Sequence, residues 1–143
     1  MDAITILNEK LVGNFYSRFS IGDTYDLSFD NFWLISNGLN SPDENSLNSY
    51  LFENYLATRG SVDKEDISKC TILAATRYRK ILDLSLTTDC TLQLEFENNV
   101  VLQFPTSTEI VDWQWAINEN GKSPYENCMV GCFWQGEIQV NAR

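Results

Sequence analysis

Histidine is absent from all 143 residues of the chain, and basic residues are scarce. The missing histidine removes the commonest general base and metal ligand at neutral pH, which excludes every nucleophile–histidine–acid arrangement. Ten Lys and Arg residues stand against twenty Asp and Glu residues, for a net charge of −10 at pH 7 and a pI near 4.3. This charge argues against nucleic acid and anionic membranes as partners and favours a positively charged protein.

Glycine and proline are also few, and no apolar run approaches the roughly 20 residues of a membrane span. Hydrophobic residues make up 43% of the chain and aromatic residues 13%, so it can bury a substantial core. We expect a single domain over residues 1–143. The segment Met1–Lys10 has no basic leader before an apolar stretch, which predicts a cytoplasmic location.

The four cysteines are Cys70, Cys90, Cys128 and Cys132. In the cytoplasm we expect them to be reduced and to behave as small buried hydrophobes, with disulfides as the alternative. The Cys128-x-x-x-Cys132 spacing is compatible with part of a zinc site, but no second close pair exists, and on one strand both side chains would point to the same side. We expect no metal and no cofactor.

Two segments, 23–35 and 89–102, share a strand–turn–strand pattern. Apolar and polar side chains alternate in both, which predicts half-buried strands, and Asp30-Asn31 and Asn98-Asn99 supply the turns. Internal duplication and independent convergence both account for the likeness. Six apolar residues of the alternating segments are predicted to form the core: Leu27, Phe29, Leu84, Leu92, Leu94 and Phe96.

The sequence Ser41-Pro42-Asp43-Glu44 has the residues of a helix start and predicts a helix over about 43–58. Its mostly apolar face comprises Leu47, Tyr50, Leu51, Asn54 and Tyr55. A short helix is predicted over 61–68 and another in the first dozen residues. Residues 71–79 are compatible with a continuation of the helix over 61–68, but the alternation over 81–87 favours one long strand that starts near Ile72.

Near the C-terminus, the segment 111–118 predicts a strand with Trp113, Trp115 and Ile117 on one core face. A final hairpin joins Cys128–Trp134 to Glu137–Val140 through Gln135-Gly136. The fold class that follows is α+β: an antiparallel sheet built from β-hairpins, with one clear helix (about 43–58) and one or two short helices.

Glu95 and Glu97 would share one strand face, where an acid/base pair or a cation site is conceivable, but the solvated side of a sheet explains them equally. We expect no catalytic residues. If the two hairpins lie in one sheet, a single acidic face results, made of Asp26, Asp30, Asp83, Glu95 and Glu97. Such a face either binds a basic partner or discourages edge-to-edge aggregation.

The chain as a whole resembles the small acidic immunity proteins that bacteria encode beside polymorphic or contact-dependent growth inhibition toxins. The resemblance lies in its acidity, in the repeated patterns Leu27–Asn31 and Leu94–Asn99, and in the Trp113–Trp115 strand. It implies stoichiometric neutralisation of a cognate basic toxin domain, often a nuclease. We expect a monomer or weak dimer that is not an enzyme and binds neither nucleic acid nor membrane.

Three aromatic residues near predicted loops or edges are candidate anchors for a toxin: Tyr16, Tyr125 and Trp134. Core packing is the competing interpretation of each. The competing function is a non-catalytic carbohydrate-binding β-rich module that stacks sugars on Trp113, Trp115 or Trp134. An enzyme that works through carboxylates alone is a third hypothesis.

Overall fold

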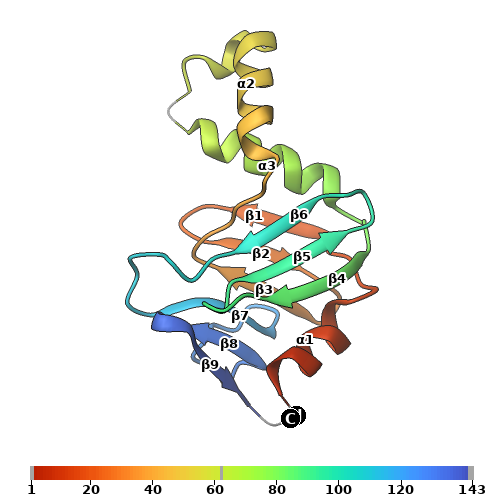
Figure 1. Cartoon of the computed structure of the whole chain (residues 1–143), viewed down its shortest axis with the longest axis vertical. Helices are drawn as coiled ribbons and strands as arrows, with labels where there is room; N and C mark the ends of the chain where they lie inside the picture. The colour runs from red at the N-terminus through yellow and green to blue at the C-terminus, as the bar shows by residue number, and fades with distance from the viewer. Residues whose placement is uncertain (1, 62, 142–143) are drawn as a thin grey trace.

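The computed structural model describes residues 2–61 and 63–141 (Figure 1). Within these residues, nine strands form two antiparallel sheets, one with the order β1-β2-β3-β7-β8-β9 and one with the order β4-β5-β6. The strands are β1 (Arg18–Ile21), β2 (Tyr25–Ser28), β3 (Phe32–Ser36), β4 (Ile81–Leu86), β5 (Leu92–Phe96), β6 (Val101–Phe104), β7 (Trp113–Glu119), β8 (Val130–Phe133) and β9 (Glu137–Val140). The helices are α1 (Ala3–Leu11), α2 (Glu44–Asn54) and α3 (Lys64–Thr76), with 3-10 turns η1 (Leu56–Thr58) and η2 (Trp134–Gly136). The predicted α+β class is confirmed.

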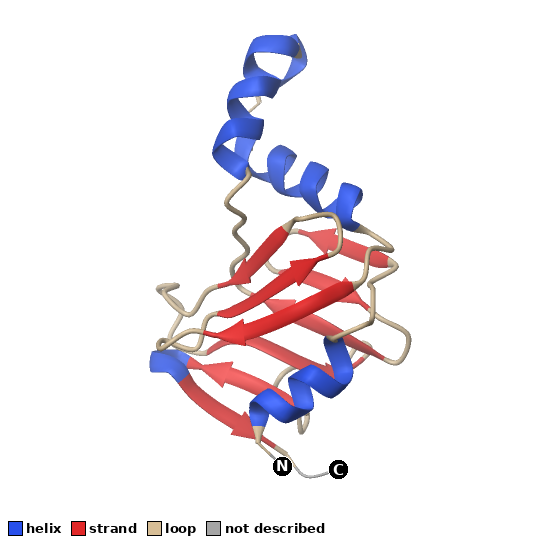
Figure 2. Cartoon of the chain, turned by 45° about the vertical axis from the view of Figure 1, so that its right-hand side comes forward, coloured by secondary structure: helices blue, strands red, loops and turns tan. Residues whose placement is uncertain are grey.

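The two sheets pack face to face, and α1 extends the smaller layer over the β8–β9 end of the larger sheet (Figures 1 and 2). The core lies between these layers. All of the residues predicted to form it are buried: Leu27, Phe29, Leu84, Leu92, Leu94 and Phe96. The hairpin of β2 and β3 therefore faces the hairpin of β5 and β6 across the core, in a different sheet.

Helix α1 confirms the helix predicted in the first dozen residues. The Asp2 carboxylate accepts a hydrogen bond from the Thr5 amide at 2.9 Å and caps the first turn. Leu7 and Leu11, one turn apart, are the buried residues of this helix and attach it to the core. Within the described residues, no helix is both long and apolar enough to cross a membrane.

The predicted turns are local features, and the structure confirms them. The Phe29 amide donates to the Phe32 carbonyl at 2.9 Å and closes the turn at Asp30-Asn31. Asn99 adopts a positive φ of 66° between β5 and β6. In the last hairpin, three residues separate the paired Phe133 and Glu137, and two of them, Gln135 and Gly136, have positive φ, at 63° and 77°.

Helix α3 corrects the prediction of a long strand from Ile72. The chain stays helical through Thr76, and β4 begins only at Ile81. The buried residues of α3 recur at helical spacing: Ser68, Lys69, Ile72, Leu73 and Thr76. The alternation that predicted the strand lies over 81–87, where β4 forms, whereas residues 68–76 bury one face at helical spacing.

Strand β7 contains a β-bulge that the sequence does not reveal. From Trp115 to Trp113 the strand advances two residues, while its partner in β8 advances one, from Cys132 to Phe133. The extra residue reverses which face of the sheet the next side chain occupies. Trp115 lies in the core, whereas Trp113 packs beside Trp33 in a second cluster on the other face. The prediction that both tryptophans share a face is wrong for this reason.

Candidate protein-binding surface

A helical arm, made of α2 and η1 (residues 44–58), projects from one end of the two sheets. Helix α3 lies across that end, next to β1 and β6, and α2 stands on α3 and points away from both sheets (Figures 1 and 2). The predicted helix over 43–58 is thus confirmed, with a break at Tyr55. No residue of α2 is fully buried. Leu47 is partly buried and packs against the core, whereas Tyr50 and Tyr55 of the predicted apolar face are exposed.

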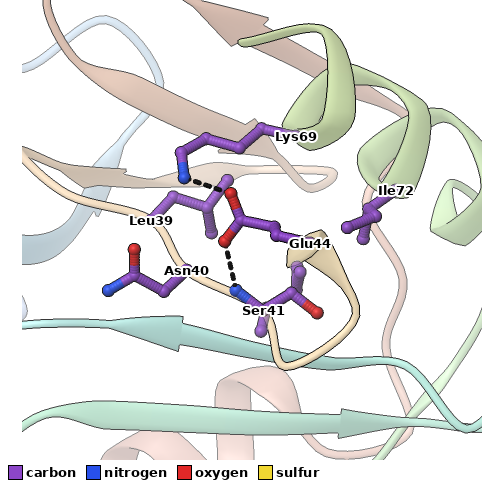
Figure 3. Close-up of a pocket in the computed structure, with 7 residues that line it drawn as sticks. Leu39, Asn40, Ser41, Glu44, Lys69 and Ile72 are labelled. Carbon is purple, nitrogen blue, oxygen red and sulfur yellow. Dashed lines mark hydrogen bonds and ion pairs between the residues drawn. The ribbon is translucent and has the colours of Figure 1, made fainter. Parts of the chain in front are cut away.

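The base of the arm is held by an ion pair between Lys69 of α3 and Glu44 of α2 (Figure 3). Lys69 is only 7% exposed and lies beside Leu39 and Ile72, in largely apolar surroundings. The second oxygen of Glu44 accepts a hydrogen bond from the Ser41 amide at 2.7 Å. Because both partners are largely withdrawn from water, this contact fixes the position of α2 on α3.

The far end of the arm is closed by polar side chains. The Thr58 hydroxyl donates to the carbonyls of Leu51 at 3.0 Å and Tyr55 at 2.8 Å. The Arg59 Nε donates to the Phe52 carbonyl at 2.7 Å. These bonds satisfy the last carbonyls of α2, and the guanidinium complements the negative end of the helix dipole. The arm therefore ends without burying its aromatic residues.

Four large apolar side chains of the arm face solvent. Tyr50 is 61% exposed, Phe52 48%, Tyr55 60% and Leu56 69%. They lie in the half of the arm farther from the sheets (Figure 1). Sequence reasoning placed Tyr50 and Tyr55 on a mostly apolar face of the helix and did not identify them as a binding surface. The available signal was Phe52, which lies on nearly the opposite side of the helix from Tyr50, so the apolar set is too wide for one packed face.

Carboxylates occur along the arm and at the start of α3: Asp43, Glu53, Asp63, Glu65 and Asp66. Burial raises the pKa of Tyr25 on β2, and the carboxylates of Asp66, Glu44 and Glu65 raise it further. These helices therefore place a negative potential over the neighbouring end of the larger sheet. Apolar anchors in a negative field are complementary to a basic protein.

The structure divides the five predicted carboxylates between two outer faces. Asp83 and Glu95 are cross-strand partners on the outer face of the smaller sheet, and Glu97 follows β5. Asp26 lies on β2 in the larger sheet, and Asp30 is exposed in the β2–β3 turn. The single acidic face predicted from the sequence is wrong, because the two hairpins belong to opposed sheets.

Of the three predicted anchors, Tyr16 is fully buried, so that prediction is wrong. Tyr16 precedes β1 and lies next to α3, and its hydroxyl donates to the carbonyl of Leu73 in α3 at 2.6 Å. Burial also raises the pKa of Tyr16. Tyr125 and Trp134 are exposed, and Trp134 lies in η2, at the far end of the larger sheet from the arm (Figure 1).

Of the three tryptophans named for the carbohydrate hypothesis, Trp115 is not accessible to a sugar. Trp115 is fully buried, and its indole Nε1 donates to the Cys90 carbonyl at 2.9 Å across the two sheets. Trp113 is half-buried in the cluster on the opposite face of the sheet from Trp115. Trp115 therefore has a structural role.

Among the cysteines, Cys70 is exposed and Cys128 and Cys132 are buried. Cys128 belongs to the outer cluster and Cys132 to the core, so the prediction that they point to the same side is wrong. The reason is that β8 begins only at Val130, after Cys128. No group of three or more His, Cys, Asp or Glu side chains is placed to hold a metal ion in the described parts of the chain.

We expect Cys70 to be the fast-reacting thiol of the folded protein. Burial raises the pKa of Cys132 to about 12, with Cys90 and Asp89 adding to the increase. At pH 8 its thiolate fraction is therefore on the order of 10⁻⁴. Time-resolved titration with an aromatic disulfide at pH 8 should lose its fast phase in Cys70→Ser. Loss of that phase in Cys132→Ser instead would contradict the prediction.

The described side chains thus bring together an apolar arm, a surrounding set of carboxylates and a buried ion pair that holds the arm in place. Two exposed cations also lie near the ring of Phe52, with Arg59 Cζ at 5.4 Å and Lys64 Nζ at 5.0 Å from its centroid. Comparisons of the chain with protein-family models, with curated protein sequences and with solved structures give no match.

Proposed function

We propose that this protein is a non-catalytic inhibitor that binds one basic protein domain stoichiometrically, in the manner of the immunity proteins that it resembles. The observation that carries the proposal is the exposure of Tyr50, Phe52, Tyr55 and Leu56 on a projecting, acid-flanked arm. Monomeric proteins seldom leave large apolar side chains clustered in water without a binding role. Aromatic residues are also enriched among the residues that dominate binding energy.

A nuclease toxin domain is the partner class that best fits this surface. The substrate site of a nuclease is positively charged, because it must neutralise phosphates, and it stacks bases on flat side chains. A convex arm with carboxylates and aromatic rings presents similar chemistry in protein form. Binding there would exclude the nucleic acid by occupying its site. The carboxylates would mainly accelerate association, and the apolar anchors would slow dissociation.

The test is co-expression with the product of the adjacent upstream reading frame in the source genome. We expect a basic protein that is toxic alone, harmless together with this chain, and recovered with it at 1:1 stoichiometry. Association should slow as ionic strength rises. A partner that stays toxic in the complex would contradict inhibition, and failure to recover any basic partner at low salt would contradict the binding proposal.

A further inference from the structure

A groove of about 760 Å³ lies between α3 and the edge strand β1. Phe19 and Ile21 line it from β1, and Ile67 and Ala74 line it from α3. Phe19 and Ile21 are only partly buried, although both pack against the core. The groove therefore has apolar walls that continue the core outward to the edge of the larger sheet.

The edge of β1 that borders this groove has free backbone groups. The Gly22 amide donates to the Thr24 carbonyl at 3.0 Å, and hydrogen-bonded pairs alternate along an antiparallel ladder. The next such pair is Ser20 with Asp26, so the amide and carbonyl of Ser20 point toward β2. Those of Phe19 and Ile21 point the other way, where β1 has no neighbour among the described strands. Such an edge is a template for another strand.

The groove also carries negative charge. Asp63 and Asp66, at the start of α3, line it together with the apolar residues. Tyr25 lies opposite Ile21 in the β1–β2 ladder. Among the carboxylates whose charge raises the pKa of Tyr25, Asp66 has the largest effect. A second copy of this acidic chain would bring like charge to the same place, whereas a basic segment would find complementary charge.

We propose that this groove is a β-augmentation site, in which an extended basic segment of the partner pairs with β1 and extends the larger sheet. The amides and carbonyls of Phe19 and Ile21 supply the main-chain hydrogen bonds. Apolar side chains of the segment pack against Phe19, Ile21 and Ile67, and its Lys or Arg side chains lie near Asp63 and Asp66. The inference rests on the proposed function. It gives the partner a second binding surface in addition to the arm.

Two exposed alanines of α3 provide a matched pair of variants. Ala74 lines the groove and Ala75 does not, so Ala74→Trp fills the groove while Ala75→Trp adds the same ring elsewhere on the helix. We expect Ala74→Trp to weaken binding of the co-expressed basic partner at least tenfold and Ala75→Trp to leave it unchanged. Thermal unfolding of both variants checks that they fold. Wild-type affinity of a folded Ala74→Trp would overturn the groove proposal while leaving the arm and the proposed function intact.

A probe peptide tests the groove independently of the toxin. We choose an acetylated, amidated Lys-Val-Lys-Val-Lys-Val peptide, with Glu-Val-Glu-Val-Glu-Val as its control. Because Cys70 is exposed and lines the groove, the basic peptide should slow its reaction with a thiol reagent several-fold and the acidic peptide should not. Hydrogen exchange at the amides of Phe19 and Ile21 should slow as well, while that of Ser20 stays unchanged. Unaltered exchange at both edge amides under saturating basic peptide would overturn strand addition.

Discussion

Replacing Lys69 with methionine should lower the free energy of unfolding by about 3–5 kcal/mol, because it leaves the Glu44 carboxylate without its partner in a site largely closed to water. Methionine retains most of the length of the lysine side chain, so lost packing contributes little. Urea unfolding followed by tryptophan fluorescence gives the value. The loss should appear as a lower midpoint with an unchanged slope.

Two further variants distinguish the effect of leaving a buried charge unpaired from the general effect of removing a lysine on stability. In Glu44→Gln/Lys69→Met the glutamine still offers an oxygen to the Ser41 amide, so much of the lost stability should return. Lys122→Met breaks the other ion pair of the described residues, that of Lys122 with Glu119, whose side chains are both 47% exposed. It should cost less than about 1 kcal/mol. Equal effects of Lys69→Met and Lys122→Met would contradict the structural role assigned to Lys69.

The double variant Tyr55→Ala/Leu56→Ala should weaken binding of the basic partner at least a hundredfold. Central anchors of an interface contribute about 2 kcal/mol or more each. Leu56 and Tyr55 are neighbours in the chain, and their side chains are 69% and 60% exposed. Titration calorimetry on the purified partner gives the affinity. Because neither side chain is buried, the free energy of unfolding should change by less than about 1 kcal/mol.

An exposed leucine elsewhere provides the control. Leu82 is 60% exposed on the smaller sheet, against 69% for Leu56 on the arm, so Leu82→Ala removes a similar apolar area from another surface. We expect Leu82→Ala to bind the partner like the wild-type chain. If it weakens binding as much as Leu56→Ala, the partner contacts the smaller sheet, and the arm is not the principal surface.

The features that the sequence predicted well depend on neighbours in the chain. The turns were placed by residues that short turns favour, Asp30-Asn31 in one hairpin and Gly136 in the other, and the core leucines follow from simple alternation. Sheet membership depends on contacts between distant segments. Both hairpins carried the same pattern, yet nothing local indicates that one joins the larger sheet and the other faces it. The bulge at Trp113 was hidden for a related reason, since only pairing with β8 defines it.

The candidate surface was predicted only in part. The helix after Ser41 was expected, but an apolar pattern along a helix does not tell what that helix packs against. Tyr50 and Tyr55 were placed on a mostly apolar face of the helix, and the structure leaves both exposed. Tyr16 was misplaced in the opposite sense, because its burial depends on the second half of α3, which was expected to be a strand.

The direct pairing of β3 with β7 joins strands that are far apart in the sequence, which affects the order of folding and the part of the chain that can vary. Ser36 lies opposite Trp115, so the larger sheet closes only after residues 37–112 have looped out and returned. Closing a loop of that length costs conformational entropy, which predicts late assembly of this pair in the folding reaction. The arm and one wall of the groove both belong to that looped-out insertion. Substitutions there could change the partner that is bound while the six-stranded scaffold keeps its own pairing.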